Sequence, residues 1–270
     1  MTLFSCILVQ PVFAIGLECT DPDVVFCMDL ADGWGTVARD SSKTGANGTL
    51  VGGPAWVQQS AARPTWNPTK GSTYAYAHSP PNHIQFTHTA GEHITTVNTT
   101  VGDFSGSKPG MLAFVMKQND SNTPAACNNQ VIWGWGAALG GWRFRMCGGG
   151  GYVDALELSI TAVASICFLC ENAGQCSCRF PDHNPHSYGV WFDGAGNFLM
   201  FQDGKLERTV TGIADFATEA NTGFTVALAQ GGNEWGGEIW GLRVWKAIVS
   251  RHQAEQFFKA YHDKFIYGGN

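Results

Sequence analysis

The stretch YGVWFDGAGNFLMFQDGKLERTV, residues 188–210, decides the fold. It holds three runs rich in apolar and β-branched residues, which are 188–192, 198–202 and 205–210. Asp193-Gly194-Ala195-Gly196 separates the first two runs, and Asp203-Gly204 separates the last two. Asp-Gly between such runs is among the strongest short hairpin signals. The stretch therefore predicts three consecutive antiparallel strands joined by two tight turns.

More strand patterns lie on both sides of this stretch, and they are 24–30, 111–117, 131–136, 142–146, 224–229 and 238–245. Turn-forming residues fill 40–42 and 45–54. The one helical pattern comes last. Ser250 can cap it with Gln253 as the capping-box partner, and Phe257, Phe258, Tyr261 and Phe265 then share one face. This order predicts an all-β, antiparallel β-sandwich with a short C-terminal helix.

Length and composition are consistent with one large all-β domain. The chain has 270 residues, of which 44% are hydrophobic and 14% are charged, and it contains 34 glycines. The net charge of −6 argues against a nucleic-acid partner, because counterion release needs clustered Lys and Arg. No apolar run reaches the roughly 18 residues that span a bilayer, so we expect no transmembrane segment.

The first residues have the pattern of an export signal. Residues 2–14 are apolar and end on Val12-Phe13-Ala14, although no Lys or Arg precedes them. We therefore expect a signal peptide over 1–14, a domain over 15–270, and a secreted or surface location. The sequons at Asn47, Asn98 and Asn119 are compatible with a secreted glycoprotein, though such short motifs also arise by chance.

Eight of the nine cysteines follow the proposed signal, and an even number in an exported domain predicts disulfides. They are Cys19, Cys27, Cys127, Cys147, Cys167, Cys170, Cys176 and Cys178. The last four lie within twelve residues. Four clustered thiolates could instead hold zinc, but zinc folds usually separate the two pairs further. We expect disulfides, with the last four cysteines bonded within or near their own loop.

Three separated stretches together resemble the laminin-G-like, concanavalin A-like lectin and glucanase superfamily. They are Asp40-Ser41-Ser42 with Gly48 to Pro54, then His186 to Lys205, then Gly237 to Ser250. The resemblance implies a jelly roll of two antiparallel sheets, with ligands bound at a concave face or rim loops. Trp240 stands where many relatives carry an acidic residue, and the 167–178 segment has no counterpart.

The tryptophans of the 131–136 strand are the candidate binding residues. Trp133 and Trp135 share one face of that strand, Arg143 and Arg145 share one face of the next, and Asn129 precedes both. Indoles stack on sugar rings, while amides and guanidinium groups bond the hydroxyls. The alternative is that aromatic residues at a period of two form the sandwich core.

Catalysis and metal binding have weaker support. No Glu-x-Asp-x-x-Glu string is present, and the nearest acidic pairs are Asp154 with Glu157 and Glu234 with Glu238. A lyase would want a His or Tyr base beside Arg143 or Arg145, and the sequence shows no matching His-bearing strand. Asp40, Asp103 and Asp120 lie in expected loops, so calcium is possible without a firm ligand set.

We therefore predict an exported non-catalytic binding module for a glycan or glycoprotein. The alternatives are a structural or adhesion subunit of a virion, appendage or cell surface that binds protein, and a polysaccharide-degrading hydrolase or lyase. An exposed Trp on the concave face would favour the first, and apolar patches on the convex sheet or its edges the second.

Overall fold

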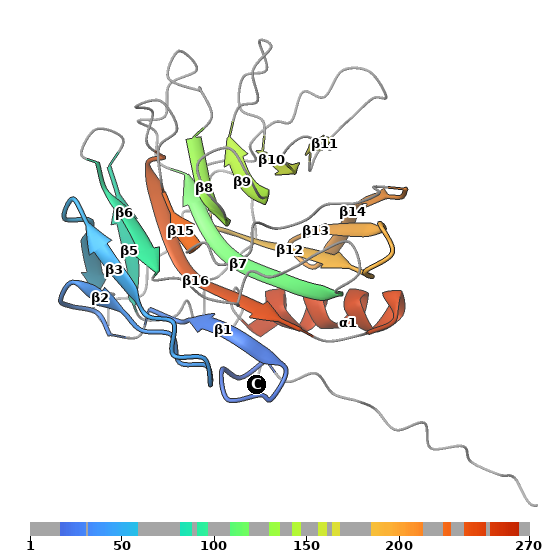
Figure 1. The fold of residues 1–270 in the computed structure, drawn as a ribbon, viewed down its shortest axis with the longest axis horizontal. Coiled ribbons are helices and arrows are strands. Elements are labelled where there is room, and N and C mark those ends of the chain that lie inside the picture. Colours follow the sequence, from blue (N-terminus) through green and yellow to red (C-terminus); the bar gives the residue numbers. More distant parts are fainter. Residues whose placement is uncertain are drawn as a thin grey trace, which may run out of the picture.

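A computed structural model of the chain describes residues 17–30, 32–58, 82–87, 91–96, 109–118, 130–135, 142–146, 156–160, 164–167, 185–212, 224–227, 235–246 and 249–264. These residues form two eight-stranded antiparallel sheets and one helix, α1 (Arg251–His262) (Figure 1). The predicted all-β sandwich with a C-terminal helix is confirmed. α1, the helix of the described residues, is too short and too polar to cross a membrane.

Sheet A contains the hairpin strands of the deciding stretch. In spatial order its strands are β14 (Lys205–Val210), β13 (Phe198–Gln202), β12 (His186–Phe192), β7 (Gly110–Gln118), β16 (Gly237–Trp245), β5 (Asn82–Phe86) and β4 (Ala55–Gln58), and β1 (Val24–Met28) pairs with β16. Both predicted turns join antiparallel neighbours, β12 to β13 and β13 to β14.

Sheet B is built from the other strands. In order they are β11 (Ala164–Cys167), β10 (Leu156–Ile160), β9 (Trp142–Met146), β8 (Gln130–Trp135), β15 (Phe224–Val226), β6 (His93–Thr96), β3 (Gly48–Val51) and β2 (Val37–Ala38). β15 ends at Val226, and Ala227 directly after it has a left-handed φ of 59°.

The main core fills the space between the two sheets. One register row shows how sheet B contributes to it, and its members are Leu50, Ile94, Val226, Trp133 and Phe144 on five adjacent strands. All five are buried and belong to one apolar cluster with residues of sheet A. Cross-strand partners share a face of the sheet, so this row places one whole face of sheet B in the core.

The central strands of sheet A are buried on both faces where α1 packs on the face that points away from sheet B. Phe258 lies against Phe201, and Phe257 lies against Trp245, with ring centroids 4.5 and 4.8 Å apart. β7 has apolar residues on both faces: Leu112 and Phe114 point into the main core, while Ala113 and Val115 point toward the helix. A strand covered on both sides reads as a continuous apolar run, as β7 does.

Seven strands were missed or misread in the sequence: β2, β10 and β11 had no predicted counterpart, and four more strands lie between residues 48 and 96. Within 45–54, the prediction of turns alone is wrong: Gly48–Val51 is β3, which pairs with β6, and β4 follows directly. β5 and β6 had no predicted counterpart. These strands have four or five residues each and carry Thr, Gln, His or Asn between apolar positions. So short a pattern gives little periodicity, and pairing with neighbours supplies the stability.

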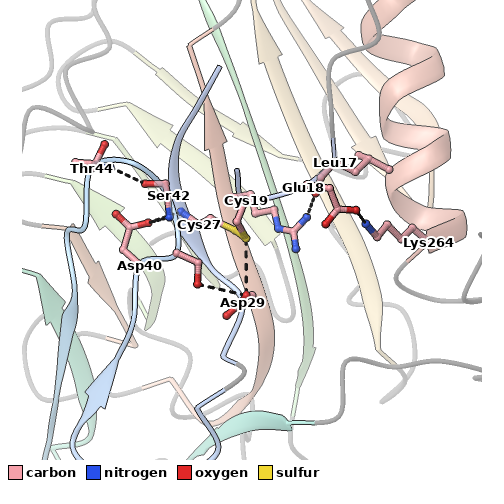
Figure 2. The surroundings of a disulfide bond; sticks show 11 residues. Leu17, Glu18, Cys19, Cys27, Asp29, Asp40, Ser42, Thr44 and Lys264 are labelled. Carbon is pink, nitrogen blue, oxygen red and sulfur yellow. Dashed lines mark hydrogen bonds and ion pairs between the residues drawn. A yellow bond between two sulfur atoms is a disulfide. The ribbon is translucent and has the colours of Figure 1, made fainter. Parts of the chain in front are cut away.

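A disulfide between Cys19 and Cys27 fixes the N-terminal segment against β1 (Figure 2). Arg243 of β16 donates a hydrogen bond to the carbonyl of Leu17, and Glu18 pairs with Lys264 just after α1. The segment is thereby tied to sheet A and to the residues that follow the helix. This pair of cysteines agrees with the predicted disulfides. The other six cysteines are not covered: five lie outside the described residues, and only the backbone of Cys167 is described.

Candidate functional site

The outer face of sheet B carries a row of threonines. Thr49, Thr95 and Thr225 are register partners on β3, β6 and β15, and we call them the threonine row. Thr49 is exposed, and Thr95 and Thr225 are half-buried. Their neighbours along each strand, Leu50 and Ile94 among them, point into the core. The threonine hydroxyls are therefore on the face that points away from sheet A.

The same register continues across the rest of sheet B. Thr225 pairs with Gly134 of β8, Gly134 with Arg143 of β9, and Arg143 with Ser159 of β10. Of Arg143 and Ser159 the structure describes only the backbone. The register row that begins with the threonine row thus continues through one glycine, one arginine and one serine. Hydroxyls both donate and accept hydrogen bonds, and a guanidinium donates up to five.

The structure corrects the placement of Trp133. Its side chain is 0% exposed and lies between Phe144 and Phe114, with ring centroids 4.5 and 5.6 Å away. The register shifts between Val131 and Trp133, and both Ile132 and Trp133 enter the core. A β-bulge of this kind turns two successive side chains to one side. Trp133 is therefore a core residue and presents no surface for stacking.

The remaining predicted binding residues are located only by their backbones. Trp135 pairs with Phe224, Arg143 with Gly134, and Arg145 with Val131. The register places Phe144 opposite Trp133, so neither arginine shares the row of that indole. The prediction that the indole and the arginines line one groove is therefore wrong for Trp133. Asn129 lies outside the described residues, as do Asp103 and Asp120, and the side chain of Trp135 is not described.

Sequence reasoning missed the most exposed tryptophan among the residues that the structure describes. Trp34 is 74% exposed in the loop between β1 and β2. The other large hydrophobic residues exposed by more than a third, among those described, are Val37 of β2 and Val51 of β3. All three lie on or beside the same edge of sheet B. The signal in the sequence was Gly33-Trp34-Gly35, a tryptophan between two turn residues.

A polar cluster lies on the outer face of sheet A, beyond the helix. Glu238 of β16 contacts Lys117 Nζ at 3.1 Å and His83 Nε2 at 3.5 Å, and the His83 ring stacks on Trp240. Burial lowers the pKa of His83, and Lys117 lowers it further, against an opposing effect of Glu238. His83 is on a strand that the sequence did not reveal. Glu238 is held here by a cation and an imidazole, which is an ordinary structural arrangement for a half-buried carboxylate.

A second polar cluster joins the β12–β13 hairpin to α1. His186 Nδ1 lies 2.6 Å from Asp203, while Ser187 Oγ and Asp203 Oδ1 lie 3.0 and 3.6 Å from His262 Nδ1. A Ser-His-Asp triad needs the serine and the carboxylate on different ring nitrogens. Here both approach the same nitrogen, and Ser187 is buried. The cluster therefore fixes the helix to the sheet.

The carboxylate of Asp40 is occupied by the backbone. Oδ1 accepts hydrogen bonds from the N–H groups of Cys27 and Ser42, and Oδ2 accepts from Ala46. Asp40 thus organises its own turn, which is the usual task of an Asp in such a place. Within the described ranges, no three His, Cys, Asp or Glu side chains are placed to hold a metal ion.

Comparison with known proteins shows the fold. No protein-family model and no curated protein sequence matches the chain. Among solved structures, it is similar to domain 4 of AbnA, a GH43 extracellular arabinanase from Geobacillus stearothermophilus, in complex with arabinotriose. The TM-score is 0.57 at 15% identity, over 87% of this chain and 97% of that one.

Two further structures share the architecture. The binding domain of Paraclostridial Mosquitocidal Protein 1 has a TM-score of 0.60 at 12% identity, and this chain spans 52% of it. A Trypanosoma rangeli sialidase in complex with sialic acid has a TM-score of 0.55 at 9% identity, and this chain spans 34% of it. At these identities the likeness establishes a common β-sandwich fold. The laminin-G-like resemblance of the sequence stays a prediction at the level of the family.

Proposed function

We propose that the chain is an exported, non-catalytic binding module that recognises carbohydrate on the outer face of sheet B. The observation that carries this proposal is the threonine row on a sheet face that α1 does not cover. The corresponding face of sheet A is occupied by α1 and by the N-terminal segment. Beyond the helix, the polar side chains of Lys117, Glu238 and His83 on that face contact one another.

The chemistry of the row suits a sugar chain. Sugars present alternating donors and acceptors, and hydroxyl side chains can meet both. Adjacent strands are about 4.8 Å apart, so the distance from Thr49 on β3 to Arg143 on β9 is roughly 19 Å over four strand spacings. An oligosaccharide of several units that lies across the strands would contact successive members of the row.

The comparisons and the disulfide add support. One structure of the same fold is the arabinanase domain bound to arabinotriose, and another is a toxin binding domain. The Cys19–Cys27 disulfide is typical of an oxidising compartment, which favours export. The proposed signal over 1–14 lies outside the described residues.

Variants of the row test the proposal. Thr95→Val and Thr225→Val keep the β-branched shape and remove the hydroxyl. Each lost hydrogen bond should cost about 0.5–1.5 kcal/mol, so the double variant should bind roughly 5- to 150-fold more weakly. The control is Thr209→Val, an exposed threonine of β14 on sheet A. Binding is measured on a glycan array that includes arabinotriose and sialylated glycans.

Two outcomes would contradict the proposal. The wild type could bind no glycan on the array, or the double variant could bind like the Thr209→Val control. Incubation of the wild type with the same glycans, followed by analysis for cleavage products, separates a binding module from a hydrolase or lyase.

One observation favours the structural alternative. Val37 and Val51 expose apolar surface beside the edge strand β2 of sheet B. Apolar residues at a sheet edge can mark a protein contact. A chain that binds no glycan and forms a complex through this edge, lost in the Val37→Glu and Val51→Glu variants, would be a structural or adhesion subunit.

A further inference from the structure

Trp34 is presented by a loop with a defined conformation. The structure describes residues 29, 30 and 32–36 of the connection between β1 and β2, and the two glycines that flank Trp34 both have left-handed backbones, with φ of 69° and 87°. Glycine takes this conformation without steric cost. The chain therefore turns sharply on each side of the indole, and Trp34 is 74% exposed.

Side chains of sheet A anchor both flanking carbonyls. Trp56 Nε1 of β4 donates to the carbonyl of Gly35 at 2.8 Å, and Gln58 Nε2 donates to that of Gly33 at 3.2 Å. A Cβ atom on Gly33 would lie 2.8 Å from Asn82 Nδ2, so only glycine allows this close contact without a shift. The loop is thus held on the edge of sheet A, while its last residue, Thr36, accepts a hydrogen bond from Leu50 of sheet B.

This arrangement is typical of a recognition residue. An indole buries a large apolar area on contact, and it favours flat, partly polar ligands because its ring also carries an N–H donor. Anchors on both sides of Trp34 mean that little further entropy is lost when a ligand binds. A residue exposed by accident needs neither anchor.

The charges around the loop distinguish the ligand classes. Arg39, which follows β2, is paired with Asp32 of the loop at 3.3 Å, and the whole chain has a net charge of −6. Such a surface has no electrostatic attraction to anionic lipid headgroups. The polar side chains that belong to the loop or contact it include an amide, a carboxylate and a guanidinium, which come from Gln58, Asp32 and Arg39. These groups bond sugar hydroxyls.

We propose that Trp34 is a stacking platform for one ring of an uncharged or weakly charged sugar, at the edge of the sandwich and beyond the threonine row. The inference rests on the carbohydrate-binding function proposed above, and it adds a contact at the edge that the sequence did not indicate. Trp34 would touch the ligand directly. Trp56 would be a positioning residue that acts through the carbonyl of Gly35.

Affinity electrophoresis in gels that contain arabinan, xylan, galactan or laminarin tests the inference. Trp34→Ala should weaken binding roughly 5- to 150-fold, as for other exposed aromatic anchors. Trp34→Phe should keep part of the affinity because a smaller ring still stacks. Val51→Ala, which removes exposed apolar surface on the same edge, is the matched control and should bind like the wild type. Trp56→Phe keeps the ring, loses the donor to Gly35, and should weaken binding less than Trp34→Ala.

The possible outcomes separate this inference from the proposed function. If the wild type binds and Trp34→Ala binds equally well, the function stands and the inference is wrong. If no polysaccharide and no array glycan binds the wild type, both fail. If binding to an immobilised glycoprotein needs Trp34 but survives periodate oxidation of its sugars, the partner is protein and the sugar platform is overturned. Melting temperatures of the Trp34 and Val51 variants should stay near that of the wild type, which shows that lost binding is not lost folding.

Discussion

Two tryptophans show how position decides the role of one residue type. Trp133 is 0% exposed and contacts Phe114, Phe144 and Phe224, whereas Trp34 is 74% exposed on an anchored loop. Both are followed by glycine in the sequence. The first lies on a strand whose inner face meets the opposite sheet, and the second lies in a turn at the edge. Trp133 therefore contributes burial energy to the core, and Trp34 is the residue for which we propose a ligand contact.

The Trp133→Ala variant should destabilise the fold by about 3–5 kcal/mol, because it leaves a large cavity between the sheets. Chemical denaturation monitored by circular dichroism measures this change. Trp34→Ala is the control, and it should change the free energy of unfolding by no more than about 0.5 kcal/mol. Equal stability of the two variants would show that Trp133 does not pack the core.

At the scale of elements, α1 is specified both locally and by its contacts. Ser250 accepts a hydrogen bond from the backbone of Gln253, and the Gln253 side chain accepts one from the backbone of Ser250, so the predicted capping box is confirmed. Phe257, Phe258 and Tyr261 are buried on the predicted face, while Phe265 lies outside the described residues. The buried face of α1 packs on sheet A at Gly189.

A Cβ atom at Gly189 would lie 2.3 Å from Phe258 Cδ1, so the helix rests on bare backbone there. Gly189→Ala should therefore force the helix outward and cost about 1–3 kcal/mol. The double variant Gly189→Ala with Phe258→Leu should recover part of that loss, because the smaller side chain leaves room. Thermal unfolding measures both.

Gly241→Ala is the matched glycine control for this variant. Its added Cβ would meet only the carbonyl of Met28, at an ordinary 3.5 Å. If Gly189→Ala and Gly241→Ala melt at the same temperature, α1 does not pack on Gly189 as described.

At the scale of the whole molecule, two buried histidines link stability to pH. Burial lowers the pKa of both His83 and His262, against the opposing effects of Glu238 and Asp203. In the unfolded chain each imidazole titrates near its ordinary value of about 6.5. Below that pH the unfolded state binds more protons than the folded state. The stability that the neutral imidazoles contribute is thus complete above about pH 6.5 and declines as the pH falls.

We expect the free energy of unfolding to decrease between pH 7.5 and 5.5, by at most about 1.4 kcal/mol per pH unit for each imidazole. Denaturation curves at several pH values measure the slope. The double variant His83→Gln with His262→Gln should flatten it. The control His252→Gln, on the exposed side of α1, should leave it unchanged. The same slope in the double variant would show that other groups cause the dependence.

Much of the fold could be predicted from local pattern. The two Asp-Gly turns, the strands around them and the capped helix were all visible, because turn chemistry and side-chain period act between residues close in the chain. The short strands β3, β4, β5 and β6 were not, because each depends on pairing with a strand far away in the sequence. The disulfide of Cys19 and Cys27 agreed with the cysteine count, although the count alone could not assign the partner.

The sequence by itself determined that Trp133 and Trp135 lie two positions apart in one strand. Only the tertiary structure decided that Trp133 faces the core. A period of two shows which residues share a face, and the opposite sheet decides which face is buried. The threonine row has the same origin, since Thr49, Thr95 and Thr225 are far apart in sequence and meet only through strand register. Trp34 was visible as a tryptophan between glycines. Its role depends on Trp56 and Gln58, which the fold brings to its loop from an edge strand of the other sheet.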